Sequence, residues 1–282
     1  MLTVLEIIKR TTEFLAAKGI ASPRHNAEVL IGHALSRKRM QLYLEFERPL
    51  TEAELSQIRP LVKRRGQHEP IQYILGETEF GGIKLKIDRR ALIPRPETEL
   101  LVELVLTWRE ANPPVTRIMD LGTGSGAIAL ALGQAMPDAN IVAVERSADA
   151  LALAGENAAL LGFGGRVSLI SSDWYSAVAV VPFDVIVSNP PYLSAGETAE
   201  TDLEVRGFEP GEALTAAADG CGDLEVIIAG APRYLKPGGL LALETGIAQH
   251  ARLIGLLRQA GFSQAESKRD LTGRDRFILA VL

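Results

Sequence analysis

The chain has 282 residues, of which 47% are hydrophobic and 23% are charged, and its net charge is −5. This composition is that of a globular protein, and the length is enough for one large or two modest domains. The single cysteine and the four scattered histidines exclude an internal disulfide framework and offer no zinc-ligand pair, so we expect no metal.

The N-terminal stretch is interrupted by charged residues. Glu6, Lys9 and Arg10 fall inside its first apolar run, which excludes an uninterrupted signal-peptide core. No window of the chain approaches the roughly 18 apolar residues that a membrane-spanning helix needs. We therefore expect a cytoplasmic protein with no membrane partner.

Residues 1–70 carry helical patterns only, and we predict a small helical bundle. One face of the first helix carries Leu5, Ile8, Thr12 and Leu15. Ser22 is an expected N-cap, with Pro23 at the first position of a second helix. Thr51 and Glu54 form a capping box that opens a third helix, which Pro60 is expected to kink.

The charge is unevenly spread along the chain. Residues 1–70 contain 12 Lys and Arg against 8 Asp and Glu, whereas residues 71–282 contain 18 against 27. The runs Arg37-Lys38-Arg39 and Lys63-Arg64-Arg65 are typical of solvated helix ends, where cations complement the helix dipole. The alternative is a basic face that meets an acidic or RNA-bearing partner.

The pattern changes at residue 71. Ile83, Leu85 and Ile87 alternate with charged residues, as in a half-exposed strand, and Gly81-Gly82 marks a turn before it. We predict a β-hairpin linker over residues 71–93. After Pro94-Arg-Pro96 we predict a helix whose apolar face consists of Leu100, Leu101, Leu104 and Val105.

After Pro113-Pro114, strand and helix patterns alternate. The strand candidates are residues 115–121, 140–145, 166–171, 183–188, 239–245, 264–269 and 275–281. Helices are predicted at 126–135, 147–161, 222–235 and 247–260. This alternation predicts an α/β domain with a mostly parallel sheet covered on both faces. Ligands in this architecture bind at the carboxyl ends of the strands, near the reversal of strand order.

Three motifs follow the first three strands. Asp120-Leu-Gly-Thr-Gly-Ser-Gly126 joins the first strand to a helix, and its glycines let the backbone approach a ligand closely. Glu145 ends the second strand, 19 residues after Gly126, and can accept hydrogen bonds from both hydroxyls of a ribose. After the third strand, Asp173 can accept from an adenine amino group while Trp174 covers the ring. These motifs predict a ribosyl ligand, and a dinucleotide also fits the glycine spacing.

The fourth motif indicates the chemistry. A buried strand from Val185 ends in Asn189-Pro190-Pro191-Tyr192. Two consecutive prolines lock the backbone and remove its donors, which leaves carbonyl oxygens in fixed directions. An NH2 group on a planar system offers two donors, and this loop offers two converging acceptors, the Asn189 side chain and the Pro190 carbonyl. The alternative interpretation is a rigid turn after a strand.

These four motifs, in this order, resemble those of the amino-methyltransferases. Within that group the chain resembles the release-factor glutamine methyltransferases, through the further stretches Glu69–Gly76, Leu92–Glu99, Phe208–Pro210 and Asp270–Arg276. The resemblance implies a seven-stranded, Rossmann-like S-adenosylmethionine methyltransferase domain over residues 94–282. It also implies that the helical bundle of residues 1–70 recognises the substrate.

Carried over to this chain, the family's cofactor site would comprise Gly122, Thr123, Gly124, Ser125, Gly126, Glu145, Asp173, Trp174 and Asn189. Its catalytic and substrate-amide site would comprise Asn189, Pro190, Pro191 and Tyr192. Two positions depart from the family. Glu145 stands where Asp is common, and the longer acid can still reach a ribose. Gly81-Gly82 stands where members often carry an aromatic residue; if that side chain encloses the glutamine, its role falls to Phe80 or is lost.

The resemblance implies methyl transfer from S-adenosylmethionine to the side-chain amide nitrogen of a glutamine. The substrates would be peptide-chain release factors, modified in their Gly-Gly-Gln motif. Asn189 and Pro190 would hold both N–H bonds and aim the nitrogen at the methyl carbon, and their dipoles would favour the positive charge that grows on nitrogen. Pro191 and Tyr192 would sandwich the flat amide.

Three alternatives remain open. An N6-adenine nucleic-acid methyltransferase would use the same tetrapeptide, but it predicts a basic channel beside the site. Residues 71–282 are acidic, so we expect no direct nucleic-acid substrate. A cofactor-binding regulator without catalysis and a dehydrogenase are the other two, and neither accounts for the Asn-Pro-Pro-Tyr sequence.

Overall fold

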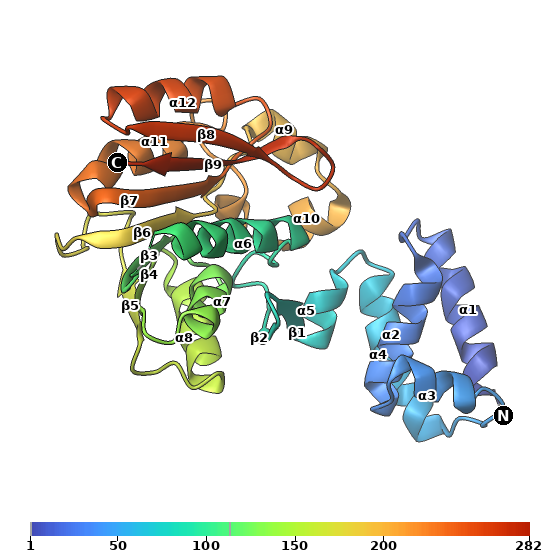
Figure 1. Ribbon diagram of the computed structural model, residues 1–282. Coiled ribbons are helices and arrows are strands. Elements are labelled where there is room, and N and C mark those ends of the chain that lie inside the picture. The colour runs from blue at the N-terminus through green and yellow to red at the C-terminus, as the bar shows by residue number, and fades with distance from the viewer. Residues whose placement is uncertain (1, 113) are drawn as a thin grey trace. The chain divides into compact units, whose positions relative to one another are not determined.

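The computed structural model describes residues 2–112 and 114–282, so Met1 and Pro113, the first residue of the Pro113-Pro114 pair, lie outside it (Figure 1). The chain divides into two compact units. The first comprises Met1–Glu77 with Asp202–Phe208, and the second comprises Thr78–Thr201 with Glu209–Leu282. Within the described ranges, every helix is too short or too polar to cross a membrane.

The first unit is helical, as predicted. Its helices are α1 (Val4–Ala17), α2 (Pro23–Leu35), α3 (Arg39–Leu44), α4 (Glu52–Arg65), α5 (Ile71–Leu75) and, from later in the chain, α10 (Leu203–Phe208). The capping box of Thr51 and Glu54 is present, and α4 continues through Pro60.

Two local predictions for this unit are confirmed in part. Ile8 and Leu15 lie on the buried face of α1, but that face is completed by Val4, Ile7 and Thr11, so Leu5 and Thr12 lie at its border. The reason is packing, because Val4 and Ile7 complete a cluster with Leu55 and Ile58 of α4. Ser22 is the N-cap of α2 and Pro23 begins the helix, as predicted, but Ser22 adopts a left-handed conformation with φ of 48° and its side chain makes no capping hydrogen bond. The Asn26 side chain instead donates to the Ser22 carbonyl, which holds the turn.

The basic run at the end of α4 is not a uniform surface. Arg65 is only 3% exposed; its guanidinium donates to the Asn26 side chain at 2.7 Å and the Glu69 carbonyl at 3.0 Å, and it pairs with Glu204. Arg64 makes two bonds to the Glu69 carboxylate, at 2.8 and 2.9 Å. Of the three cations only Lys63 is exposed, which corrects their interpretation as solvated helix-end charges.

The predicted linker contains a helix as well as the hairpin. Residues 71–75 form α5, and the hairpin consists of β1 (Glu77–Phe80) and β2 (Ile83–Lys86). Gly81 and Gly82 make its turn with positive φ, as expected. Ile83 and Leu85 are buried whereas Lys84 and Lys86 are exposed, which confirms the half-exposed strand.

The second unit is built on a seven-stranded sheet, and all seven predicted strands are present. They are β3 (Arg117–Leu121), β4 (Asn140–Glu145), β5 (Val167–Ser171), β6 (Phe183–Ser188), β7 (Leu235–Glu244), β8 (Gln264–Arg269) and β9 (Asp275–Val281). Their order is β5-β4-β3-β6-β7-β9-β8, and β9 runs antiparallel to the other six strands. The chain first builds outward from β3 through β4 to β5, then returns to β6. The order therefore reverses between β3 and β6, where such sheets bind ligands.

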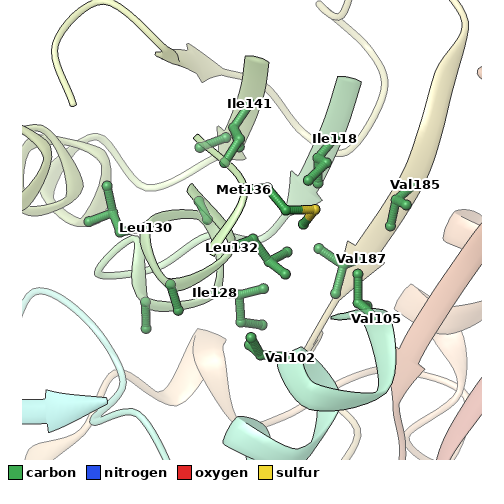
Figure 2. Close-up of a cluster of buried hydrophobic side chains, with 14 of the residues drawn as sticks. Val102, Val105, Ile118, Ile128, Leu130, Leu132, Met136, Ile141, Val185 and Val187 are labelled. Atoms are coloured by element: carbon green, nitrogen blue, oxygen red, sulfur yellow. The ribbon is translucent and has the colours of Figure 1, made fainter. Parts of the chain in front are cut away.

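Helices cover both faces of the sheet (Figure 1). One face packs against α6 (Pro96–Ala111), α7 (Ala127–Ala135) and α8 (Ala148–Leu160), and the other against α11 (Gly222–Gly230) and α12 (His250–Gln259). Figure 2 shows Val102 and Val105 of α6 with Val185 and Val187 of β6 on the first face. Ile186, between those two valines, points to the second face. This alternation buries every residue of β6 and fixes where the strand ends.

No helix or strand is predicted from the sequence for the segment after β6. It forms α9 (Ala195–Glu200), then α10 of the helical unit and the short turn η1 (Gly211–Ala213).

Candidate active site

The glycine loop joins β3 to α7. Gly122 has φ of +73° and Gly124 has φ of +56°, a region that favours glycine. A Cβ on Gly122 would lie 3.3 Å from the Trp174 ring, whereas one on Gly124 would meet open space. The loop therefore packs closely against Trp174 and exposes its backbone to a cavity.

The buried acid Asp120 stabilises the glycine loop through hydrogen bonds. Asp120 is fully buried, and its Oδ2 accepts from the Thr123 hydroxyl at 2.6 Å and the Ala129 amide at 3.1 Å. Its Oδ1 has no hydrogen-bond partner among the described residues. Burial, with a smaller contribution from Glu145, raises the pKa of Asp120 to about 7. Thr123 and Ser125 are buried too, so their side chains shape the loop from inside.

Glu145 stands at the end of β4, and its carboxylate is already oriented. Oε2 accepts from the Gly124 amide and Oε1 from the Ser147 amide, both at 2.9 Å. Each oxygen keeps lone pairs, because a carboxylate offers about four acceptor sites. Glu145 can thus accept hydroxyl donors while it holds the loop.

Asp173 and Trp174 follow β5. Asp173 is exposed at the edge of the cavity, and Trp174 is half-buried with φ of +46°, which is rare for a bulky residue. The Trp174 indole nitrogen donates to Asp223 at 3.2 Å, and the Ser172 hydroxyl donates to the Trp174 carbonyl at 2.9 Å. These bonds hold the aromatic ring beside Gly122.

The loops line an open cavity in the second unit. Of the residues predicted for the cofactor, those that line it are Gly122, Gly124, Glu145, Asp173, Trp174 and Asn189. The structure thus brings residues from four strand ends to one place.

The Asn-Pro-Pro-Tyr sequence begins where β6 ends. The Ser188 hydroxyl donates to the Leu121 carbonyl at 2.6 Å, which ties the end of β6 to the end of β3. Asn189 and Pro191 line the cavity, and Pro190 is buried between them. The Asn189 side-chain nitrogen donates to the Thr98 hydroxyl at 3.1 Å, so its Oδ1 remains available as an acceptor.

A buried carboxylate lies behind this tetrapeptide. Glu244, at the end of β7, is 1% exposed and accepts from Thr98 at 2.7 Å and from the Tyr192 hydroxyl at 3.2 Å. Burial raises the pKa of Glu244. The Arg276 guanidinium lies 5.5 Å from the centre of the Tyr192 ring, and Gln249 donates to the Tyr192 carbonyl at 2.9 Å.

Comparison with known proteins identifies the family. Residues 6–76 match the family described as PrmC N-terminal domain, and residues 97–208 match the methyltransferase small domain. The release factor glutamine methyltransferase of Geobacter sulfurreducens is 40% identical over 276 residues, covering 98% of this chain and 95% of its own. The Salmonella typhimurium protein of the same name is 43% identical over 257 residues, covering 90% and 91%. This chain belongs to the release factor glutamine methyltransferase family.

A solved structure supports the fold of this methyltransferase. The hMettl16 catalytic domain, solved in complex with an RNA hairpin from the MAT2A 3′UTR, has a TM-score of 0.56 at 17% identity and covers 82% of this chain and 80% of its own. At that identity the likeness concerns the fold alone.

Sequence reasoning missed part of the methyltransferase cavity wall. The segment Arg90–Leu92 and the segment Pro210–Ala213 also line it. They are fastened together, because the buried Glu209 carboxylate accepts from the Ile93 amide at 3.1 Å and from Arg95 at 2.7 Å. The sequence offered a signal for both segments. Each adjoins a stretch that supports the family resemblance, Leu92–Glu99 or Phe208–Pro210, to which no role is assigned from the sequence.

Thr98 and Glu244 were also missed. Thr98 lies in the Leu92–Glu99 stretch, whereas Glu244 carried no signal beyond an acid at the end of a predicted strand. Phe80 does not take the role considered for it, because its side chain is 1% exposed and belongs to the hydrophobic core.

Proposed function

We propose that this methyltransferase transfers a methyl group from S-adenosylmethionine to the side-chain amide nitrogen of the glutamine in the Gly-Gly-Gln motif of release factors. The observation that carries the proposal is the state of Asn189. Its NH2 group is committed to Thr98, which leaves Oδ1 as an acceptor at the cavity beside the glycine loop.

The cavity suits the cofactor by its donor and acceptor chemistry. Glu145 offers acceptors for ribose hydroxyls, Trp174 offers an aromatic face for adenine, and Gly124 leaves space where a side chain would intrude. Asp173, exposed at the edge, would accept from the adenine amino group.

The chain's own residues would act by placement. When bound, S-adenosylmethionine supplies a methyl carbon activated by its sulfonium. Asn189 Oδ1 and the Pro190 carbonyl would each accept one hydrogen of the amide, which turns the nitrogen toward that carbon. The same two dipoles favour the positive charge that grows as the N–C bond forms and the C–S bond breaks. The proton then leaves to water, so no side chain is required as a strong base.

Pro191 and Tyr192 would hold the plane of the amide. Tyr192 is half-buried, its hydroxyl is bonded to Glu244 and its carbonyl to Gln249, so its ring is fixed before substrate arrives. A side chain that is already fixed loses no further conformational entropy when the substrate binds.

An N6-adenine nucleic-acid methyltransferase is the second candidate, because an adenine amino group would fit the same acceptors. The acidic balance of residues 71–282 disfavours it.

We propose that the helical unit supplies a second contact with the release factor. A groove between α1 and α4 has apolar walls that include Ile7 and Phe14, with Arg10 and Lys63 exposed beside them. Arg59 also lines the groove but is paired with Glu52. Reversing the charge of Arg10 and Lys63 should raise the KM for intact release factor about fivefold, the effect of roughly 1 kcal/mol of lost electrostatic attraction. The KM for a short Gly-Gly-Gln peptide should stay unchanged.

The matched control is Lys9→Glu, which reverses a charge on the exposed side of α1 away from the groove. The control reverses one charge and the groove variant reverses two, so a rise of KM of about twofold in the control would assign the effect to net charge and not to the groove.

Peptide mass spectrometry of purified release factor tests the main proposal. After incubation with enzyme and S-adenosylmethionine we expect one added methyl on the glutamine of the Gly-Gly-Gln motif. RNA and DNA offered in parallel with tritiated cofactor should stay unlabelled. Label in nucleic acid and none in the protein would favour the adenine methyltransferase instead.

A further inference from the structure

An asparagine amide can present either of two faces to a ligand. Its oxygen accepts hydrogen bonds and its nitrogen donates them, and a half-turn about the last side-chain torsion exchanges the two. Only the orientation with Oδ1 toward the cavity suits a substrate NH2 group. In the reverse orientation the Asn189 NH2 group would face the NH2 group of the substrate amide, and two donors cannot form a hydrogen bond.

The contacts behind Asn189 select one orientation. An ionised carboxylate only accepts hydrogen bonds, so the Thr98 hydroxyl gives its single proton to Glu244 Oε2 at 2.7 Å. The Thr98 oxygen is then left with lone pairs alone toward Asn189, 3.1 Å away. Asn189 must therefore turn its NH2 group to Thr98 and its Oδ1 the other way.

The same carboxylate also orients the aromatic wall. Tyr192 donates to the second oxygen of Glu244, at 3.2 Å. Burial raises the pKa of Glu244, and the hydrogen bonds from Thr98 and Tyr192 and the charge of Arg276 act against that effect, so these three groups support the ionised acid. Thr98 and Glu244 are 4% and 1% exposed, so solvent does not compete for these bonds. One acid thus sets the direction of both the acceptor and the wall.

We propose that Thr98 and Glu244 are positioning residues that fix the orientation of the Asn189 amide, and that this makes the site select a carboxamide over a carboxylate. The inference rests on the proposed function, since it takes an amide as the substrate. We call the hydrogen-bonded series Asn189–Thr98–Glu244 the relay. Without it, Asn189 could turn its NH2 group to the cavity, where that group would donate to the carboxylate of a glutamate in place of glutamine.

The test compares Thr98→Val with Thr98→Ser. Valine keeps the shape but removes the hydroxyl, whereas serine keeps the hydroxyl and loses only the methyl group. With a Gly-Gly-Gln peptide, Thr98→Val should lower kcat about 30-fold, the effect of a lost hydrogen bond to a charged group, and Thr98→Ser less than about threefold. The affinity for S-adenosylhomocysteine should be unchanged in both.

Inhibition by a Gly-Gly-Glu peptide shows whether Thr98 orients the Asn189 amide or only stabilises the structure around it. The ratio of its inhibition constant to the KM of the Gly-Gly-Gln peptide should fall about tenfold in Thr98→Val, since a rotated Asn189 gains a hydrogen bond to the carboxylate. It should stay at the wild-type value in Thr98→Ser. Loss of kcat with an unchanged ratio, or equal losses in both variants, would overturn the proposal.

Thr98→Val leaves one oxygen of the buried carboxylate without its donor, so it could unfold. The double variant Thr98→Val/Glu244→Met removes both polar partners and avoids that penalty. Thr98 and Glu244 act on Asn189 through one contact, whereas Glu244 alone also holds Tyr192. The loss of kcat in the double variant should therefore be smaller than the product of the losses in Thr98→Val and Glu244→Met. A loss equal to the product of the two single effects would contradict a shared relay.

A measurement without substrate separates this inference from the proposed function. In wild-type enzyme the side-chain NH2 protons of Asn189, assigned by their loss in Asn189→Ala, should exchange slowly with water because of the bond to Thr98. Exchange should be at least about tenfold faster in Thr98→Val than in Thr98→Ser. Equal exchange rates in the two variants would contradict the relay. Absence of methyl transfer by the wild-type enzyme would contradict the proposed function alone.

Discussion

The two halves of the carboxyl edge of the sheet are built differently. On the side of β3, β4 and β5, the carboxylate at the cavity is held by backbone, because Glu145 accepts from the Gly124 and Ser147 amides. On the side of β6 and β7, side chains hold side chains: Asn189, Thr98, Glu244 and Tyr192 form one connected set with a buried carboxylate in its centre.

We propose that the first half binds the cofactor and that the second half positions the substrate amide for methyl transfer. A cradle made mainly of backbone tolerates the loss of one side chain, because the remaining amides stay in place. A relay of side chains in a buried setting is cooperative, and the loss of one member leaves others without partners. We therefore expect changes in the first half to affect cofactor KM and changes in the second half to affect kcat.

The largest effect should come from Asn189→Ala. It removes one of the two acceptors for the amide, and kcat should fall about 1,000-fold, the scale of losing a preorganised group in a transition state. Single-turnover methyl transfer to release factor measures it. Binding of S-adenosylhomocysteine, measured by calorimetry, is the control, and a tenfold loss of that binding with normal kcat would reverse the assignment of the two halves.

Glu145→Ala should act on the other half. The change removes the acceptor for ribose hydroxyls and a support of the glycine loop, so the KM for S-adenosylmethionine should rise about 30-fold with kcat within a factor of about three. Glu145→Asp is the matched variant and should keep most of the affinity. A kcat loss without a KM change would contradict a role in cofactor binding.

The pH dependence of kcat should report the central acid. Burial raises the pKa of Glu244, opposed by bonds from Thr98 and Tyr192 and by the charge of Arg276, while the charge of Glu97 raises it further. Since the relay needs the ionised acid, kcat should fall about tenfold per pH unit as pH drops below this raised pKa. Glu244→Gln removes the ionisation, and its kcat should lack that decline. An identical acid limb in this variant would assign the titration to another group.

Trp174→Phe should have the smallest effect. It keeps an aromatic face for the adenine and loses only the 3.2 Å bond from the indole nitrogen to Asp223. The KM for S-adenosylmethionine should rise about threefold, the effect of one neutral hydrogen bond. Trp174→Ala is the informative partner, since a KM equal to that of Phe would show that the ring itself contributes nothing.

The strand ends could be predicted from the sequence because each motif there is local. The run Phe183–Ser188 is buried on both faces, so its apolar pattern predicts both the strand and the place where Asn189 emerges. The glycine loop and Glu145 follow their strands in the same way. The two hydrogen bonds of Glu145 join residues only 2 and 21 positions apart in the sequence.

The relay could not be predicted, because its contacts join residues far apart in the chain. Thr98 lies 91 residues from Asn189 and 146 from Glu244. Arg65 is a similar case, since a charged residue at a helix end indicates solvent until partners such as Asn26 and Glu204 are known to surround it. Local pattern thus predicts where a chain turns, but long-range packing decides which polar groups are buried together.

The most direct test is a crystal structure with S-adenosylhomocysteine and a peptide containing Gly-Gly-Gln. We predict that Asn189 Oδ1 and the Pro190 carbonyl oxygen each lie within about 3.2 Å of the glutamine nitrogen, which faces the sulfur of the cofactor product. An Asn189 side chain and a Pro190 carbonyl that both point away from the bound amide would contradict the account.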